Sequence, residues 1–377
     1  VFPNEPILTI EGTIFEAMLV ETAILNIFNH ETLIATKAAR IREVSGNKTL
    51  AEFGARRAHG FGAALRGTRA TYIGEFDGTS LVEAGKRFGI PVIGTMSHAF
   101  VQSFEDELDS FIAYGEENEG NVILLVDTYD TLKIGVPNAI KAAKILSKKG
   151  IKVDGIRLDS GDLAYLSKEA RKMLDGEGLQ DVKIVASSDL DENIIANLEL
   201  QGGKIDTYAV GTKVITAYDQ PALGGVYKLS ETIEEGIRIP KIKVSDNVEK
   251  IITPGRKKLY RIINQKTGKA EGDYITRFIE ALPAEGENLL LFDPIHTWKK
   301  KTVEKFYAIE LQEQVMDKGK RMKEDPHIEE IKEYKKMALN QFWDEHKRLV
   351  NPQEYYVDLS QELWELKDKM IKERRKI

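Results

Sequence analysis

Polar side chains follow a series of short apolar segments, each at the point where the apolar residues end. His98, Asp127, Arg157 and Asp159 are the most reactive of these groups. Single positions have ordinary explanations, because an Asp after a strand commonly caps the next helix and an Arg–Asp pair can be a plain ion pair. Their recurrence along the chain predicts one shared site. The complete predicted set is Phe53, Arg56, Arg57, Thr79, Ser80, His98, Asp127, Arg157, Asp159, Ser188, Asp189, Gly211 and Thr212.

The residue types in this set predict a site for a phosphorylated sugar. Segments rich in Gly, Ser and Thr, at Ser188 and at Gly211 and Thr212, supply backbone N–H groups of the kind that bind phosphate. Carboxylates such as Asp127 and Asp159 repel phosphate, but they suit sugar hydroxyls or Mg²⁺, which bridges phosphates. We therefore expect a sugar phosphate and Mg²⁺ in the same site.

Arginines predict a second, anionic substrate. Arg56 and Arg57 follow Phe53 closely, and guanidinium groups hold carboxylates or phosphates through paired hydrogen bonds. An aromatic ring beside them suits a flat ligand. The role of His98, in "GTMSHAF", stays open from its residue type alone: a buried structural histidine, a metal ligand or a catalytic group.

The elements that must position these residues are short strands alternating with helices. This rhythm predicts parallel strands joined by helical crossovers, and apolar runs such as "VILLV" indicate strands buried on both faces. A complete or incomplete barrel of the TIM type is the expected fold, with an open doubly wound sheet as the alternative. The predicted strands are 49–53, 71–76, 91–95, 122–127, 155–159, 183–187 and 207–211.

The flanking regions have other patterns. Residues 13–45 predict one long helix or two shorter ones, and antiparallel strands with a hairpin turn at "NQKTGK" are expected after residue 224. Helices are predicted at 303–322, 327–348 and 360–375.

Composition excludes several classes of protein. The 377 residues carry a net charge of −6, which argues against a nucleic-acid-binding protein. No apolar run approaches the ~20 residues of a membrane span, and no signal segment begins the chain. The absence of cysteine excludes disulfides and thiolate metal sites and fits a cytoplasmic location. No two of the six histidines have helical metal-ligand spacing.

Nine segments together resemble nicotinate phosphoribosyltransferase, and they extend over nearly the whole chain. Each motif alone is of moderate specificity, whereas the ordered set is highly specific. They are "VFPNEPILTIEG", "TLIATKAARI", "EFGARRAHG", "GTMSHAF", "VDTYDTL", "RLDSGDL", "SSDLDE", "VGTKVITAYDQPALGGVYKL" and "RLVNPQEYYVDLS".

The resemblance implies a reaction and a two-domain fold. Nicotinate and phosphoribosyl pyrophosphate would give nicotinate mononucleotide and pyrophosphate, coupled to ATP hydrolysis, in NAD salvage. The fold would be an α/β sandwich domain with an irregular barrel, and the active site would lie at a homodimer interface. We accordingly divide the chain into part of the sandwich domain with a linking helix (1–45), the barrel (46–224), a return to the sandwich (225–300) and a C-terminal helical region (301–377).

The resemblance also implies residue roles on the pyridine side. Phe53 would stack on the ring and Arg56 would hold its carboxylate, with Arg57 as an equal candidate. Thr79 and Ser80 would line the substrate site. The related nicotinamide enzyme has an Asp where this sequence has Ser80, and an Asp would repel a carboxylate, so Ser80 favours nicotinate.

On the sugar side, the resemblance makes His98 the residue that ATP phosphorylates. Asp127 and Asp159 would face ribose and Mg²⁺-bound pyrophosphate, so that Mg²⁺ is held without direct protein ligands, and Arg157 would hold anionic oxygen. The 5′-phosphate region and ribose would be bound by Ser188, Asp189, Gly211 and Thr212.

One departure and three alternatives accompany this interpretation. The family has roughly eighty or more residues before the "FPNEP" segment, including an aromatic that reaches the partner's site, so we expect poor activity or stability of this chain alone. A nicotinamide or quinolinate enzyme of the same fold is the nearest alternative. A sugar-phosphate aldolase or isomerase using Lys213 lacks an evident partner base. A non-catalytic relative should have lost the charges of the site, which are present.

Overall fold

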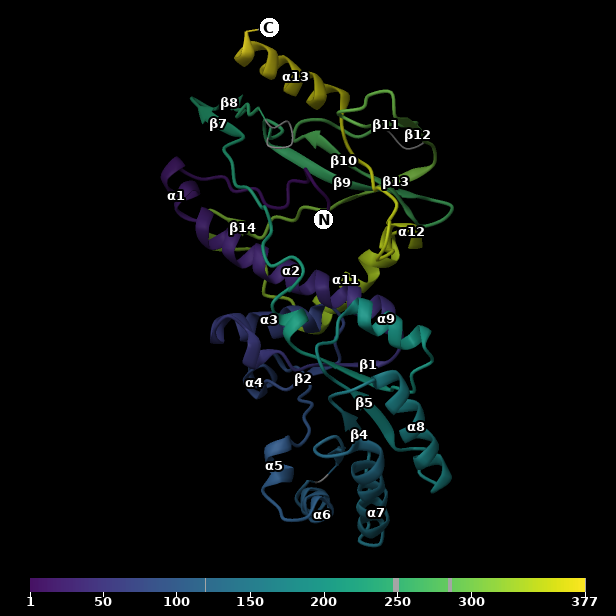
Figure 1. Cartoon of the computed structure of the whole chain (residues 1–377). Coiled ribbons are helices and arrows are strands. Elements are labelled where there is room, and N and C mark those ends of the chain that lie inside the picture. The colour runs from purple at the N-terminus through teal and green to yellow at the C-terminus, as the bar shows by residue number, and fades with distance from the viewer. Residues whose placement is uncertain (119, 247–250, 284–286, 377) are drawn as a thin grey trace. The chain divides into compact units, whose positions relative to one another are not determined.

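The computed structural model describes residues 1–118, 120–246, 251–283 and 287–376 (Figure 1). The chain divides into two compact units. The barrel unit contains Asn26–Gly224 and His327–Lys332, and the second unit contains Val1–Leu25, Gly225–Pro326 and Glu333–Ile377. None of the helices in these described ranges has the length and apolar composition of a membrane span.

A curled sheet of six parallel strands is the centre of the barrel unit. Its strand order is β2-β1-β6-β5-β4-β3, which confirms the predicted incomplete parallel barrel. Side chains such as Leu124, Ile156 and Leu158 are fully buried, as expected for strands covered on both faces. The strands are β1 (Thr49–Glu52), β2 (Gly78–Thr79), β3 (Ile123–Leu125), β4 (Gly155–Leu158), β5 (Lys183–Ala186) and β6 (Thr207–Val210).

Helices connect these strands. α6 packs against α7, and α7 against α8 (Figure 1). Asp162 and Asp191 cap α8 and α9 through their carboxylates, the role that Asp commonly takes before a helix. The helices are α2 (Glu21–Ser45), α3 (Phe61–Ile73), α4 (Val82–Phe88), α5 (His98–Gln102), α6 (Glu107–Glu117), α7 (Val136–Ser147), α8 (Leu163–Gly176), α9 (Glu192–Leu200) and α10 (Thr212–Ile215), with a 3-10 turn at Ala55–Arg57 and a π turn at Thr131–Gly135.

Two predicted strands of the barrel are not strands. The segment 71–76 begins inside α3, where Tyr72 packs with Ala84 and Ile90, so tertiary contact overrides its β propensity. The segment 91–95 contributes one isolated parallel bridge, Thr79 to Val92. β2, at Gly78–Thr79, was not among the predicted strands, so the sheet has six strands instead of about seven.

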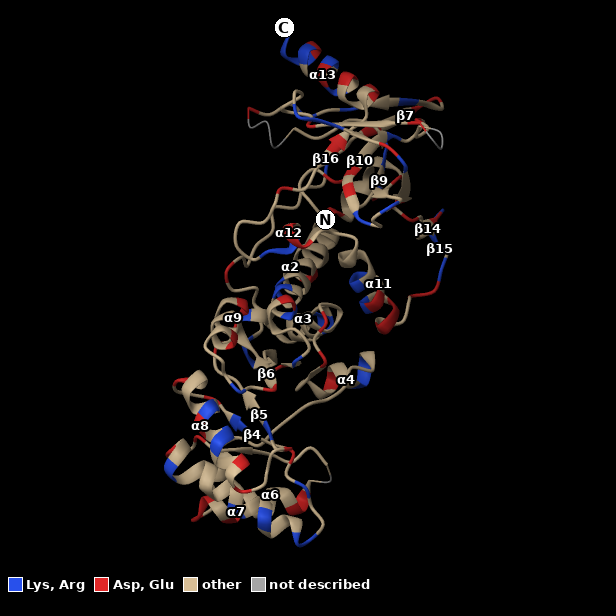
Figure 2. Ribbon diagram, turned by 90° about the vertical axis from the view of Figure 1, so that its right-hand side faces the viewer, with Lys and Arg blue, Asp and Glu red and all other residues tan. Residues whose placement is uncertain are grey.

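The second unit is built mainly from antiparallel strands. Its largest sheet has the order β13-β9-β10-β16, and the predicted hairpin turn joins β9 to β10. Lys and Arg are interspersed with Asp and Glu along α13, as they are along α8 in the barrel unit (Figure 2). The elements are α1 (Ile14–Leu19), β7 (Glu231–Glu234), β8 (Ile237–Pro240), β9 (Lys257–Asn264), β10 (Ala270–Arg277), β11 (Leu289–Phe292), β12 (Lys300–Val303), β13 (Phe306–Glu310), β14 (Met316–Asp317), β15 (Lys320–Arg321), α12 (Asp344–Lys347), β16 (Val357–Leu359) and α13 (Gln361–Arg375).

The predicted helix at 303–322 is wrong. This segment contains β13, which pairs with β9, and the hairpin of β14 and β15. Charged residues suggest a helical surface, but Gly319 has φ +76° in the hairpin turn, a conformation that ends a helix. Residues 301–377 thus contain strands in addition to the helices α11 (Ile328–Asn340), α12 and α13.

Candidate active site at the carboxyl ends of the strands

Most predicted site residues lie just beyond the carboxyl ends of the parallel strands. Phe53 follows β1, and Ser80 follows β2. Asp127 lies two residues after β3, Asp159 follows β4, and Gly211 follows β6. Because parallel strands end at the same edge of a sheet, the strand order brings these positions to one edge. We call this edge, with the residues that follow the strands there, the rim.

His98 and Asp127 are in direct contact. His98 begins α5 after the cap residue Ser97, and its Nε2 lies 3.1 Å from Oδ1 of Asp127. Oδ2 of Asp127 accepts hydrogen bonds from Asp159 N at 3.1 Å and Ser160 Oγ at 2.6 Å. The Asp127 side chain is 2% exposed, whereas that of His98 is 41% exposed. A buried, fixed carboxylate therefore orients an imidazole that solvent and ligands can reach.

Arg157 is held by three side chains of the rim. It donates from Nε to Ser187 Oγ (2.9 Å), from Nη1 to Thr95 Oγ1 (2.9 Å) and from Nη2 to Asp159 Oδ1 (2.8 Å). Its guanidinium carbon also lies 5.5 Å from the centre of the Phe53 ring. This fixed geometry presents a positive charge next to an aromatic face.

Asp159 is ionised by its surroundings. Burial alone would raise the pKa of this carboxyl, but hydrogen bonds from Ser187 and Arg157 and the positive charge of Arg157 lower its pKa overall. Ser187 Oγ donates to the same oxygen that receives Arg157. The rim therefore contains a carboxylate and a guanidinium in one fixed ion pair.

The turn after β5 has an unusual backbone. Ser188 and Asp189 have φ values of 99° and 42°, in the region that favours glycine. Both side chains are exposed. Backbone strain of this kind is concentrated at functional sites.

The pyridine-side residues divide into two groups. Phe53 is half-buried, and Arg56, Arg57 and Ser80 are exposed. Neither arginine side chain forms a hydrogen bond or an ion pair with the described part of the chain, so both guanidinium groups are available to an anion. Thr79 differs, because it is 1% exposed and its hydroxyl is bonded inside the protein.

Four residues that the predicted set omits belong to these networks: Glu52, Thr95, Ser160 and Ser187. Three are hydroxyl residues: Ser160 and Ser187 come after β4 and β5, and Thr95 comes after the isolated bridge at Val92. The fourth, Glu52, is a charged residue inside the predicted buried strand "TLAEF". Charged residues are rarely buried, so its position in this strand could have marked it as a residue with a special role.

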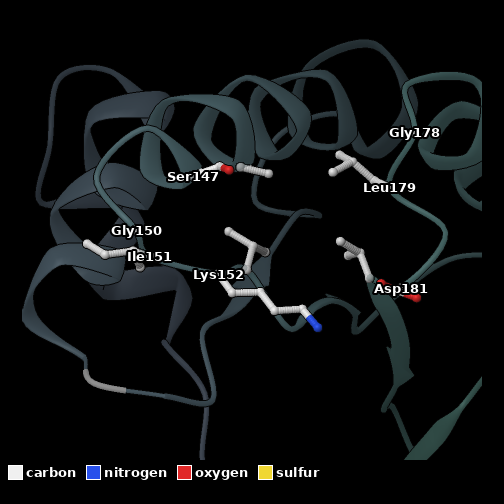
Figure 3. A pocket seen from close by; sticks show the side chains of 10 residues that line it. Ser147, Gly150, Ile151, Lys152, Gly178, Leu179 and Asp181 are labelled. Carbon is white, nitrogen blue, oxygen red and sulfur yellow. The ribbon is translucent and has the colours of Figure 1, made fainter.

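The opposite end of the sheet has a different character. A pocket of about 280 Å³ lies near the amino ends of β4 and β5, where Ile151, Val153 and Leu179 are among its lining residues (Figure 3). It contains none of the predicted site residues. No group of three or more acidic or His side chains suited to a metal ion occurs in the described ranges.

Lys213, the candidate residue for the aldolase alternative, is engaged. Its Nζ lies 2.7 Å from Asp191 Oδ2 in an ion pair that is largely shielded from solvent. An amine engaged in an ion pair of this kind is poorly placed to act as a Schiff-base nucleophile. The ion pair of Lys213 therefore argues against the aldolase alternative.

The curled parallel sheet and its charged rim define an α/β-barrel enzyme that binds anionic substrates. Two family models match the chain: the nicotinate phosphoribosyltransferase family over residues 48–201, and the nicotinate phosphoribosyltransferase C-terminal domain over 256–367. The chain belongs to the nicotinate phosphoribosyltransferase family. Its function is that of this enzyme of NAD biosynthesis, with nicotinate and phosphoribosyl pyrophosphate as substrates.

Individual relatives agree. The chain is 53% identical over 373 residues to nicotinate phosphoribosyltransferase of Bacillus subtilis, covering 99% of this chain and 76% of that protein. It is 36% identical to nicotinate phosphoribosyltransferase of Dictyostelium discoideum, covering 97% of this chain and 70% of that protein. The crystal structure of human nicotinic acid phosphoribosyltransferase superposes with a TM-score of 0.80 at 27% identity, covering 95% of this chain and 78% of that one.

Proposed function

We propose that the rim carries out phosphoribosyl transfer to nicotinate and couples it to ATP hydrolysis through His98. The continuous network from His98 through Asp127 to Asp159 and Arg157 is the observation that carries this proposal. It connects a reactive imidazole to the groups that would surround the leaving pyrophosphate. A change at either end can therefore be transmitted to the other.

His98 is suited to accept a phosphoryl group. Because Asp127 can only accept a hydrogen bond, its contact requires the imidazole proton at Nε2, which leaves the lone pair at Nδ1 free. Nδ1 would attack the γ-phosphorus of ATP, the bond to the ADP oxygen would break, and Asp127 would stabilise the charged ring. Water would then release inorganic phosphate and restore His98.

The transfer step needs charge stabilisation more than a base. The pyridine nitrogen of nicotinate is itself the nucleophile, and the ribose C1–oxygen bond to pyrophosphate breaks. Arg157 would stabilise the negative charge on pyrophosphate, and Asp127 and Asp159 the positive charge on ribose. The backbone around Ser188, Asp189, Gly211 and Thr212 would hold the 5′-phosphate and ribose.

The carboxylates fit Mg²⁺ bound through pyrophosphate. Both oxygens of Asp127 and one oxygen of Asp159 already accept hydrogen bonds from the protein. They are thus poorly placed to form a protein-only cage, and Mg²⁺ usually keeps phosphate and water ligands. When bound, the ion would neutralise the leaving group.

Phe53, Ser80 and either Arg56 or Arg57 would form the nicotinate subsite. The exposed arginines would hold the carboxylate, and the neutral Ser80 would donate to it without repulsion. The proposal also includes a cytoplasmic homodimer whose active site lies at the subunit interface. Sedimentation and cell fractionation test those two parts.

A product assay tests the central proposal. The protein is supplied with phosphoribosyl pyrophosphate, Mg²⁺ and nicotinate, with and without ATP, and nicotinamide and quinolinate replace nicotinate in parallel reactions. We expect nicotinate mononucleotide, faster with ATP, and little product from the other two acceptors. Turnover that is indifferent to ATP, without any phosphorylated protein, would contradict the coupling.

A further inference from the structure

Glu52 is a charged residue at the end of β1, yet its exposed fraction is 0%. Its carboxyl accepts hydrogen bonds from the backbone N–H of Gly54, from Thr79 Oγ1 at 2.6 Å and from Thr68 Oγ1 at 3.1 Å. Burial raises the pKa of this carboxyl, while these hydrogen bonds act in the opposite direction. No Lys or Arg of the described ranges forms an ion pair with it. Burying a carboxyl without a cation costs free energy, which its hydrogen bonds must offset. We therefore ask what these hydrogen bonds hold in place, which is their structural task.

One task concerns the end of β2. The Thr79 hydroxyl accepts from Leu81 N at 3.0 Å, so its own proton is free to be donated to Glu52. The backbone carbonyl of Glu52 also accepts from Ser80 N at 2.9 Å. Side chain and main chain of Glu52 together therefore fix the segment that presents Ser80.

The other task concerns the turn after β1. Gly54 N–H, held by the Glu52 carboxyl, begins the 3-10 turn Ala55–Arg57 that carries both exposed arginines. Gly54 is also confined on its far side, because an added Cβ would lie 2.6 Å from Ile215 and 2.7 Å from the carbonyl oxygen of Gly211. Gly54 is therefore held on one side by the Glu52 carboxyl and on the other by Ile215 and Gly211, which leaves the turn little room to move.

We infer that Glu52 is a positioning residue that fixes the arginine-bearing turn relative to Ser80, and so sets the geometry that receives the nicotinate carboxylate. This inference rests on the proposed function, which assigns Arg56 or Arg57 and Ser80 to that carboxylate. It moves Thr79 from the substrate-contacting residues to the supporting ones. A displacement near 1 Å in such a support is enough to weaken binding and catalysis.

Steady-state kinetics of variants test the inference. Glu52→Met, of similar length, removes both carboxylate oxygens, and Thr79→Val removes the bridging hydroxyl without a change of shape. We expect both to raise KM for nicotinate about tenfold, while KM for phosphoribosyl pyrophosphate stays within about twofold. Thr79→Ser, which keeps the hydroxyl, should retain the normal KM for nicotinate. Glu52→Gln, which keeps one acceptor oxygen, should have a KM for nicotinate between those of wild type and Glu52→Met.

A matched control separates this effect from general destabilisation. Thr71 lies on the same helix as Thr68, is 1% exposed, and donates to the Thr68 carbonyl at 2.8 Å without contacting Glu52. Thr71→Val should lower the melting temperature without shifting either KM. Equal changes in both KM values for the Thr79→Val variant, or none, would overturn the inference.

The same assays distinguish failure of the inference from failure of the proposed function. Arg56→Ala, Arg57→Ala and Ser80→Ala are measured alongside. If none of the three raises KM for nicotinate, the proposed nicotinate subsite is wrong. If one does while Thr79→Val does not, the subsite stands and the role of Glu52 is refuted.

Discussion

Nε2 of His98 lies 3.1 Å from Oδ1 of Asp127, although the two residues are 29 positions apart in the chain. The contact joins the first residue of α5 to the rim beyond β3. A carboxylate at this distance favours the imidazole tautomer that is protonated at Nε2. The first prediction depends on this relationship.

His98→Ala should abolish the phosphorylated protein formed from ATP and remove the stimulation of turnover by ATP. Slow turnover without ATP should remain, because Arg157 and Asp159 keep their ion pair. Phosphoprotein is measured with radiolabelled ATP, and product formation by chromatography. His59→Ala, at an exposed histidine, is the control. Phosphoprotein that persists in His98→Ala would remove His98 from the mechanism.

Arg157→Lys should lower kcat/KM about 100-fold although the charge is conserved. A lysine cannot make the three directed hydrogen bonds to Ser187, Thr95 and Asp159 at once. Arg171→Lys is the matched control, because Arg171 also donates to three acceptors, on α8 and outside the rim. A similar loss of kcat/KM in both variants would show a general structural effect.

Ser80→Asp should reduce use of nicotinate and improve use of nicotinamide in relative terms. A carboxylate at this exposed position repels the nicotinate carboxylate, which corresponds to a loss of at least about tenfold in kcat/KM. Ser80→Asn, similar in size and uncharged, is the control for steric effects. Equal kcat/KM for nicotinate in the Asp and Asn variants would show that charge at this position does not select the substrate.

Glu5→Gln should stabilise the second unit at alkaline pH. Burial, and then the neighbouring carboxyl of Asp273, raise the pKa of Glu5 from 4.5 to about 7. The folded state therefore holds a proton that the unfolded state releases, so the stability contributed by this group is present below pH 4.5 and is lost as the pH rises through 7. The variant should remove this loss, which we put at about 3 kcal/mol above pH 7.

Denaturant unfolding at pH 5 and pH 8 checks this prediction, with Glu304→Gln, at an exposed position, as control. The difference in free energy of unfolding between wild type and Glu5→Gln should grow from pH 5 to pH 8. A difference that is constant with pH would show that Glu5 does not titrate in this interval.

Much of the site was predictable because its residues occupy equivalent positions along the chain. Asp127, Asp159 and Gly211 follow runs whose apolar character already indicated buried strands. Segments with mixed signals were harder. Tyr72 and Ile73 have strand propensity but complete a helix, and the charged segment around Tyr307 forms a strand because β9 offers it a partner.

The sequence by itself determined the family, the parallel sheet and which polar residues stand at strand ends, because these depend on local patterns and on their order. Only the tertiary structure decided which of these residues touch. The contact between His98 and Asp127 joins residues 29 positions apart, and Arg157 is directed by Thr95, which lies 62 positions away. Glu52 acquires its role from Thr79 and Thr68, neither of which is near it in the chain. Hydrogen bonds over such separations depend on how the strands and helices pack, and no local pattern records them.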